Sequence, residues 1–165
     1  MLPDAATFIA GLYWLLMLVG RLIGSVIGGK VSSRTMVICV SVLAICLMGG
    51  AMALGDSIAV LLPTSWAFKM QAVPVAALLI MLVGLCTSVM WTSIFNMATE
   101  GLGKYTAKAS GIFMMMVVGG GIVPLIQSAI TDYLFSYIVP IIGVAYILWY
   151  ALWGSKNVNT NIKID

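Results

Sequence analysis

The sequence predicts an all-α polytopic membrane protein with five transmembrane helices. Of its 165 residues, 62% are hydrophobic and only 8% are charged, and the mean hydropathy is +1.15. Soluble domains average about 45–50% apolar and about 25% charged residues, so a soluble chain of this size could not bury so much apolar surface. The apolar residues also form runs of the roughly 20 residues that a helix needs to cross the hydrocarbon core of a bilayer.

Five apolar runs form an expected transmembrane bundle at residues 1–154, which a polar tail at 155–165 follows. The spans are expected at residues 6–29, 35–54, 73–98, 109–131 and 134–154. The first run is no secretory signal, because it lacks a basic leader, is too long and contains Arg21. The longest connection carries Pro63, Trp66 and Phe68, and we expect part of it at the membrane surface, where residues 58–62 could extend the second span.

Basic residues predict the orientation of the chain. They follow the first, third and fifth spans, as Lys30 and Arg34, Lys104 and Lys108, and Lys156 and Lys163. Three such segments share one side of the membrane in a five-span chain. The positive-inside rule places that side in the cytoplasm and the amino terminus outside. We therefore expect a multi-pass protein of the cell inner membrane.

The composition argues against several classes of function. Histidine is absent and the chain has five acidic residues, which leaves little for acid–base catalysis, so we do not expect an enzyme; a membrane enzyme that uses few residues is the least favoured alternative. The basic residues are scattered, which argues against nucleic-acid binding. Cys39, Cys46 and Cys86 lie in apolar runs without metal-binding spacing, so we expect no metal or other cofactor.

The first span carries one charge and a stripe of small residues. Arg21 either extends its charged end to the membrane surface or points inward to a fixed acceptor. Gly20, Gly24 and Gly28 recur every four residues, which favours close packing of another helix. Tyr13 and Trp14 are either interfacial aromatics or the wall of a cavity. The second span has almost no polar residue besides Ser41, and we expect it to be a peripheral, lipid-facing helix.

Polar residues lie along one face of the third span. Ser88, Thr92 and Asn96 recur at a spacing of four, and Thr87 and Trp91 form an adjoining strip. Such residues either make hydrogen bonds between helices or line a water-filled cavity. We favour the cavity, because an aromatic ring beside hydroxyl and amide groups suits a sugar.

The fourth span is expected to be kinked or broken. It contains Gly119, Gly120 and Gly121 and then Pro124, which removes a backbone hydrogen bond. Interrupted helices are tolerated at membrane depth where the backbone faces protein or a cavity, and they indicate transport. Gln127, one turn later, could satisfy the freed backbone or bind a ligand. The aromatic residues near the end of the fifth span are expected at the interface.

Several short motifs occur in a characteristic order. They are Val19 to Gly24, Ile94-Phe95, Gly101 to Gly103, Ala109-Ser110 and Gly119 to Pro124. Together they resemble the sugar permeases of the major facilitator superfamily, and most of all the fucose permease and glucose/galactose transporter family. The resemblance covers nearly all of residues 10–150. Thr92 stands where the family often has proline, so the bend expected there is absent or displaced.

The resemblance implies that the five spans are helices eight to twelve of a twelve-helix sugar:proton symporter that works by alternating access. The implied partners are a monosaccharide, the lipid bilayer and the helices that precede these five. The coupling ion would be a proton, and its carboxylates would lie in the amino-terminal half, because no span centre here contains Asp or Glu.

Candidate site residues follow from the polar pattern and the resemblance together. The expected substrate-binding residues are Trp91, Thr92, Asn96 and Gln127, with Tyr13 and Trp14 behind them. The expected gating or packing residues are Arg21, Glu100, Gly119, Gly120 and Pro124, and Arg21 could form an ion pair with Glu100. The alternative is a non-transporting five-helix membrane subunit or scaffold, which the glycine stripes fit equally well.

Overall fold

The computed structural model describes residues 3–55, 57–63, 70–130, 132 and 135–156. Five segments of this part are helical, long and apolar enough to cross a membrane, which confirms the predicted fold class. The helices are α1 (Pro3–Gly28), α2 (Ser33–Leu54), α3 (Val75–Thr99), α4 (Thr106–Met116), α5 (Gly119–Ser128) and α6 (Ile138–Leu152), with the short 3-10 helices η1 (Gly103–Tyr105), η2 (Phe135–Tyr137) and η3 (Gly154–Lys156). Helices α4 and α5 together make the fourth span.

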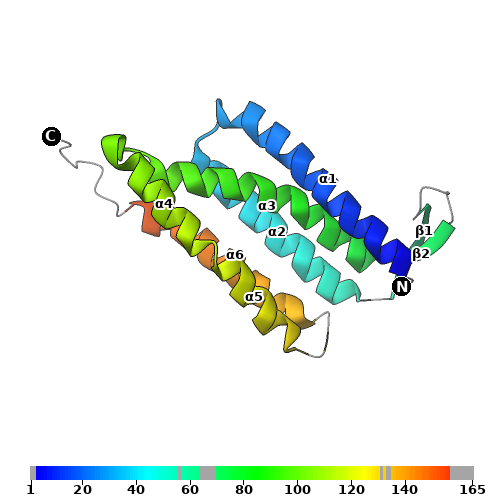
Figure 1. Cartoon of the computed structure of the whole chain (residues 1–165). Helices are drawn as coiled ribbons and strands as arrows, with labels where there is room; N and C mark the ends of the chain where they lie inside the picture. Colours follow the sequence, from blue (N-terminus) through cyan, green and yellow to red (C-terminus); the bar gives the residue numbers. More distant parts are fainter. Residues whose placement is uncertain (1–2, 56, 64–69, 131, 133–134, 157–165) are drawn as a thin grey trace.

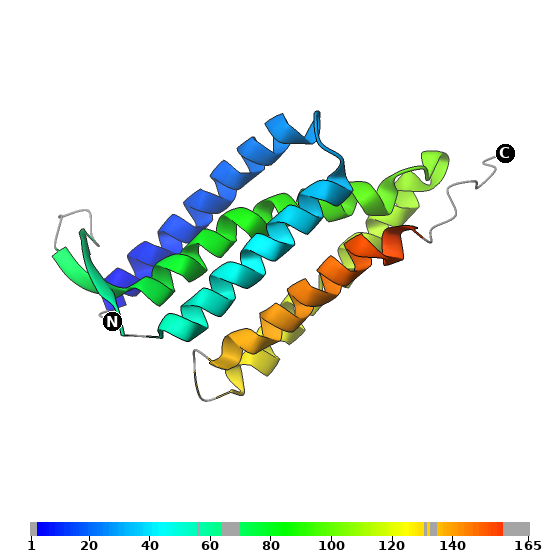
Figure 2. The same cartoon turned by 180° about the vertical axis from the view of Figure 1, so that it is seen from behind.

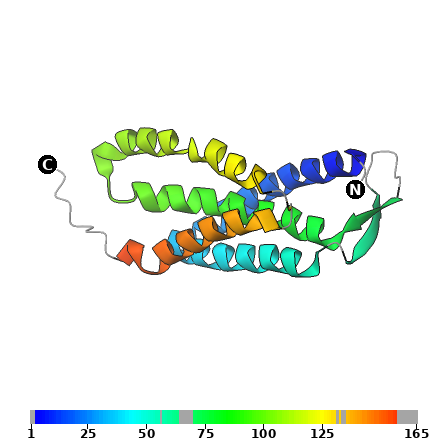
Figure 3. The same ribbon diagram turned by 90° about the horizontal axis from the view of Figure 1, so that it is seen from below.

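The helices run side by side, with α3 between α1 and α2 (Figure 1). Helix α2 packs against both α3 and α6, as the reverse view shows (Figure 2). From below, α4 and α5 lie at the opposite edge of the bundle from α2 (Figure 3). We call the end with the α1–α2 turn, the α3–α4 turn and the end of α6 the basic end. The end that holds the start of α1 is the hairpin end.

The hairpin end carries a two-stranded sheet that the sequence did not predict. Helix α2 stops at Leu54, because Gly55 adopts a φ of 55°, which favours glycine, while its N–H still bonds to the carbonyl of Ala51. The chain then forms an antiparallel hairpin of β1 (Ala59–Pro63) and β2 (Met70–Pro74). The expectation that residues 58–62 extend the second span is therefore wrong. Trp66 and Phe68 lie outside the described residues.

The largest buried cluster joins α2, α3 and α6. Its members are Ala44, Met48, Val83, Cys86, Met90 and Val144. Helix α2 also buries the hydroxyl-bearing Ser41 completely. The expectation of a peripheral second span holds for one face only: α2 packs against two helices on one side, while Cys39, Val42, Leu43 and Cys46 remain exposed on the other. Hydropathy alone cannot separate a face that meets other helices from one that meets lipid, since both are apolar.

Helices α1 and α3 approach closely at small residues. A Cβ atom added to Gly20 would lie 2.8 Å from the carbonyl oxygen of Leu85, and one added to Gly84 would meet the Tyr13 ring. At the same contact the Ser88 hydroxyl donates a hydrogen bond of 2.6 Å to the carbonyl oxygen of Met17. The packing prediction is confirmed at Gly20. It fails at the far end of the stripe, where nothing lies within 4 Å of a Cβ on Gly28.

Arg34 joins the beginning of α2 to the end of α6. Its Nε donates to the carbonyl oxygen of Ala151 and its Nη2 to that of Leu152, both at 2.7 Å. The last carbonyls of a helix lack partners within the helix and carry a partial negative charge, so a guanidinium is well suited to them. These two bonds fix α2 and α6 at the basic end.

The fourth span is interrupted as expected, slightly before its glycines. Helix α4 ends at Met116 and α5 begins at Gly119. Between them the backbone turns through tighter bonds three residues apart, such as Gly120 N–H to the carbonyl oxygen of Val117 at 2.8 Å. Pro124 lies within α5 and supplies no N–H to the carbonyl one turn earlier. Neither α4 nor α5 buries a residue in this chain.

The glycine contact between α1 and α3 can be tested by adding one methyl group. Replacing Gly20 with alanine should destabilise the protein by about 1–3 kcal/mol, because the backbone of α3 must move away. Gly11→Ala on the same helix is the control, since nothing lies within 4 Å of its Cβ; it should stabilise the helix by up to about 1 kcal/mol. Thermal unfolding in detergent measures both. Equal midpoints for the two variants would contradict the close contact.

The two hydrogen bonds of the half-buried Arg34 side chain predict a measurable loss of stability when they are removed. Arg34→Met should lower the free energy of unfolding by about 1–3 kcal/mol, because two charge-assisted hydrogen bonds are lost. The free energy of unfolding of Arg34→Lys should lie between those of the wild type and Arg34→Met, because an ammonium group cannot donate two hydrogen bonds in the forked geometry of a guanidinium. The matched control is Lys30→Met in the preceding turn, which should stay within about 0.5 kcal/mol of the wild type. Unfolding by denaturant, with Trp149 in α6 and the following Trp153 as probes, would measure the difference.

Candidate functional site

The polar residues predicted along one side of α3 fall into a buried group and an exposed group. Ser88 is buried in the α1–α3 contact, and it therefore has the interhelical role that the alternative interpretation described. Trp91, Thr92 and Asn96 are exposed, and the Thr92 hydroxyl bonds to the Val89 carbonyl of its own helix at 3.0 Å. Helix α3 is continuous through Thr92, so the bend that the family's proline would produce is absent.

Trp91 stands at the edge of an aromatic group between α3 and α4. Its ring meets that of Phe113 edge-on, with centroids 5.3 Å apart, and Phe113 also contacts Phe95 at 5.4 Å. The Trp91 side chain keeps 38% of its surface exposed, so part of the ring remains accessible. Sequence reasoning missed Phe113, which fixes the orientation of the Trp91 ring; no polar pattern marks it.

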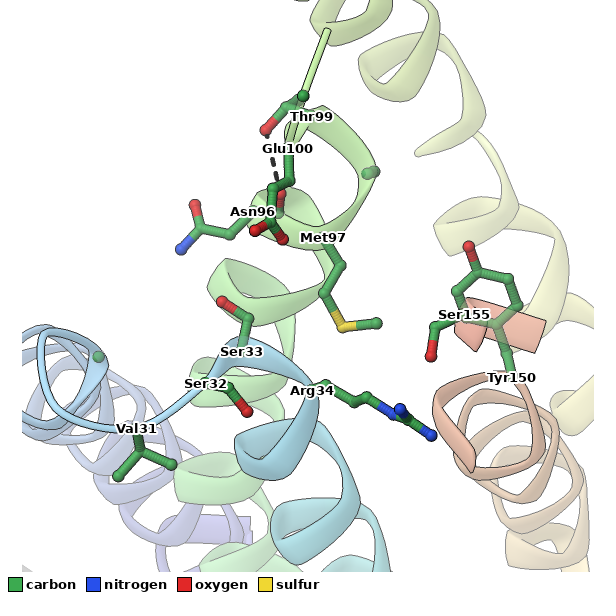
Figure 4. A pocket seen from close by; sticks show the side chains of 13 residues that line it. Val31, Ser32, Ser33, Arg34, Asn96, Met97, Thr99, Glu100, Tyr150 and Ser155 are labelled. Carbon is green, nitrogen blue, oxygen red and sulfur yellow. Dashed lines mark hydrogen bonds between the residues drawn. The ribbon is translucent and has the colours of Figure 1, made fainter. Parts of the chain in front are cut away.

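A cleft of about 890 Å³ opens at the basic end. Figure 4 shows Asn96 and Glu100 on α3 at one wall and Arg34 extended toward Tyr150 and Ser155 at the other. The side chains of Asn96 and Glu100 make no hydrogen bond or ion pair with any residue that the structure describes. Both groups are therefore available to a ligand in the cleft. The Thr99 and Ser155 hydroxyls, by contrast, bond to carbonyls of their own helices.

The proposed ion pair between Arg21 and Glu100 is not formed. Both residues are described and exposed, yet no ion pair joins them. Glu100 lines the basic-end cleft, and the residue of α1 that reaches this cleft is Gly28. Seven residues of helix separate Arg21 from Gly28, a rise of about 10 Å, so Arg21 lies too deep along α1.

A second cleft, of about 760 Å³, lies at the hairpin end. It is lined by Ala6, Ile9, Ala10, Tyr13 and Trp14 of α1, by Pro74, Ala77, Ile80 and Met81, and by Tyr137. The Tyr13 and Trp14 rings meet edge-on with centroids 6.1 Å apart. These two aromatics therefore form part of a cavity wall. Tyr137, which reaches the cleft from η2, was assigned only to the fifth span.

Gln127 lines neither cleft. Its Nε2 donates a hydrogen bond of 3.4 Å to the Ser136 hydroxyl, and this bond links α5 to η2. The other predicted residues of the fourth span, Gly119, Gly120 and Pro124, also lie outside both linings. Nothing lies within 4 Å of a Cβ built on either glycine, so the interruption is not packed against the bundle.

Arg34 was overlooked as a structural residue, although the sequence held a signal for it. It occupies the first turn of α2, where a cation is unfavourable with respect to the helix's own dipole. Such a cation needs an acceptor on another element, which the end of α6 supplies. Within the described residues, no group of three His, Cys, Asp or Glu side chains is placed to hold a metal ion.

Known sugar transporters are similar to this chain. A putative glucose/galactose transporter of Helicobacter pylori (strain ATCC 700392 / 26695) is 34% identical over 152 residues, which is 87% of this chain and 33% of that protein. A glucose/galactose transporter of Brucella abortus biovar 1 (strain 9-941) is 44% identical over 81 residues, or 47% of this chain and 20% of that protein. No family model matches the chain, and no solved structure matches it.

The chain spans about a third of the length of the Helicobacter pylori transporter that it matches. The match nevertheless covers 87% of the chain, and the structure independently shows five helical segments that are long and apolar enough to cross a membrane. The alignment thus agrees with the resemblance that the short motifs indicated. Over the part of these proteins that it spans, the chain is homologous to glucose/galactose transporters, in agreement with the resemblance to major facilitator sugar permeases.

Proposed function

We propose that this chain is the carboxyl-terminal part of a sugar:proton symporter of the fucose or glucose/galactose type. It would help to move a monosaccharide across the inner membrane by alternating access. The observation that carries the proposal is the exposed row of Trp91, Thr92 and Asn96 on a helix that otherwise packs tightly against α1 and α2. The relatives described above are glucose/galactose transporters, which supports a monosaccharide as the substrate class.

The two clefts suggest a path along α3. Met81 lines the cleft at the hairpin end and Asn96 the cleft at the basic end, and the 15 residues between them span about 22 Å of helix. Trp91 lies between these points and on the same side of α3 as the cleft residue Ile80. A sugar moving along α3 from the hairpin end would pass Tyr13 and Trp14 first and then Trp91. It would move about 140° around the helix, past Thr92, to reach Asn96.

The side chains along this path suit sugar recognition. An indole ring offers an apolar face on which a pyranose ring can stack, while amide and hydroxyl groups exchange hydrogen bonds with its hydroxyls. Gln127 would join this set from α5, because its 3.4 Å bond to Ser136 is long and is easily replaced by one to a sugar. Glu100 would accept hydrogen bonds at the mouth of the basic-end cleft, where gating is expected.

Orientation and coupling follow the charge distribution. The basic end would face the cytoplasm, since Lys30, Arg34, Lys104 and Lys108 lie there. The proton-coupling carboxylates would be supplied by helices that precede those of this chain, because none of the five spans has Asp or Glu at its centre. Arg21 would serve packing or gating near the basic end without Glu100 as its partner.

One observation favours a second candidate. Helices α4 and α5 bury no residue in this chain. Their exposed surface contains small residues, which allow another membrane helix to pack closely against it. A five-helix scaffold or subunit would use this surface to bind a partner and would transport nothing.

Sugar uptake separates the two candidates. The chain alone and the chain joined to the amino-terminal helices of a complete permease would be expressed in cells without their own sugar permeases. Uptake of labelled glucose, galactose or fucose should occur only with the joined form, and a proton uncoupler should abolish it, because coupling groups lie outside this chain. Uptake by neither form, with both present in the membrane, favours the scaffold.

The path along α3 predicts which side chains matter for transport. In the joined form, Trp91→Ala and Asn96→Ala should each raise KM for the sugar about tenfold, which corresponds to the loss of one stacking or hydrogen-bonding contact. Trp149→Ala is the matched control, because Trp149 is similarly exposed and aromatic but lies on α6 and not on α3. Initial uptake rates over a range of sugar concentrations measure the change. A similar rise in KM for the control would refute the path.

The interrupted fourth span predicts a rate effect without a loss of stability. Gly119→Ala with Gly120→Ala should leave the thermal midpoint unchanged or raise it, because open space surrounds both positions and alanine favours helix by about 1 kcal/mol. Transport should slow severalfold at unchanged KM if the interruption serves gating. Gly111→Ala in α4, which has equal space, is the control and should transport normally. Normal rates in the double variant would leave the glycines without a gating role.

A further inference from the structure

The α3–α4 turn at the basic end holds two lysines against one aromatic ring. The Nζ atom of Lys104 lies 5.5 Å from the centroid of the Tyr105 ring, and that of Lys108 lies 5.9 Å from it. Both distances are within the range of a cation–π interaction. The ring thereby holds two ammonium groups in one small region, although like charges repel.

The chain provides no anion for these charges. Lys104 and Lys108 are exposed and form no ion pair with any residue that the structure describes. The acidic residue nearest in sequence, Glu100, lines the basic-end cleft between α2 and α6 instead. Lys104 lies in η1 and Lys108 in the first turn of α4, where the helix dipole further disfavours a cation. Both effects make an external anion favourable here.

The position of the turn determines which anion can reach it. Between the end of α3 at Thr99 and the start of α4 at Thr106 the chain makes only a short turn, with Gly101 and Gly103 at positive φ. Since both helices cross the membrane, the turn lies at the depth of the lipid headgroups. Tyr105 is 46% exposed, and tyrosine is common at this depth because its ring is apolar and its hydroxyl polar.

We infer that Lys104, Tyr105 and Lys108 bind the phosphate group of an anionic phospholipid. The two ammonium groups would contact the phosphate oxygens, and the Tyr105 ring would hold both lysines in place and lie against the glycerol of the lipid. The shared chemistry is a phosphate ester, which a soluble phosphate could also offer. Membrane depth favours the lipid. The inference does not depend on sugar transport.

Lipid competition tests the site directly. The full chain in neutral detergent would be offered phosphatidylglycerol and phosphatidylcholine in equal amounts, and native mass spectrometry would give the ratio of the two lipids retained. The wild type should prefer phosphatidylglycerol. Lys104→Gln or Lys108→Gln should reduce this preference about fivefold, and the double variant about 25-fold, as expected for one surface lysine–phosphate attraction each.

Control variants separate a specific site from general surface charge. Lys30→Gln removes a charge from the other turn at the basic end, where no ring contact is found, and it should keep the preference. Tyr105→Phe should also keep it, whereas Tyr105→Ala should weaken it about two- to fivefold, because the ring face holds the ammonium groups. An equal loss in Lys30→Gln, or no preference in the wild type, would overturn the site.

Two further experiments distinguish a lipid site from a soluble phosphate site and binding by charge from a loss of folding. Inorganic phosphate added at the lipid concentration should not displace phosphatidylglycerol; if it competes equally well, the site binds soluble phosphate and the lipid assignment is wrong. If the double glutamine variant unfolds, Lys104→Arg with Lys108→Arg keeps both charges and should retain the preference. A loss of preference in this folded arginine pair, together with a normal melting temperature in phosphatidylcholine, would contradict binding by charge.

Discussion

The close contact between α1 and α3 supports most of the arrangement. Within a bilayer, no hydrophobic driving force brings helices together, so their association depends on close packing and on hydrogen bonds between them. Here Gly20 lets the backbone of α3 approach, and the bond from Ser88 to Met17 uses that proximity. Because α3 also packs against α2, the contact joins three helices. It thereby fixes the side of α3 on which Trp91 and Asn96 remain exposed.

The remaining helices are joined to this group in a different way. Helix α6 is attached through apolar packing on α2 and through Arg34, whereas α4 and α5 contribute no buried residue. The bundle is thus rigid on the α1–α2–α3 side and sparsely packed on the other. A transporter needs both properties, since a fixed wall must hold the substrate while another element moves. The interruption after Met116 lies on the sparsely packed side.

Composition and local chemistry predicted much of this fold. Five apolar runs predicted five membrane-crossing segments, and the glycines with Pro124 predicted the break in the fourth, because both follow from properties of a single segment. The contacts between different segments were harder to predict from the sequence. The apolar second span was expected to face lipid, and one side of it is exposed, but its other side, with Ser41, packs on two helices. The Arg21–Glu100 pair failed because opposite charge gives no measure of distance.

In the candidate site, too, properties of one helix could be predicted from the sequence, whereas contacts between helices could not. Spacing along one helix grouped Trp91, Thr92 and Asn96 with Ser88, and the first three are exposed, yet it could not show that Ser88 is covered by α1. The role of Arg34 required a partner more than 100 residues away in sequence. No pattern within α2 specifies which carbonyls accept its hydrogen bonds, because these belong to a helix whose position only the assembled bundle defines.

The Arg34 link also constrains the lengths of two helices. Both of its acceptors lie within the final turn of α6, so the guanidinium selects two successive carbonyls and no others. One residue inserted within α6 would rotate those carbonyls by about 100° and displace them by about 1.5 Å along the axis. The number of residues in α6 is therefore matched to that in α2. A change in the length of one of these helices must therefore be matched by a change in the other.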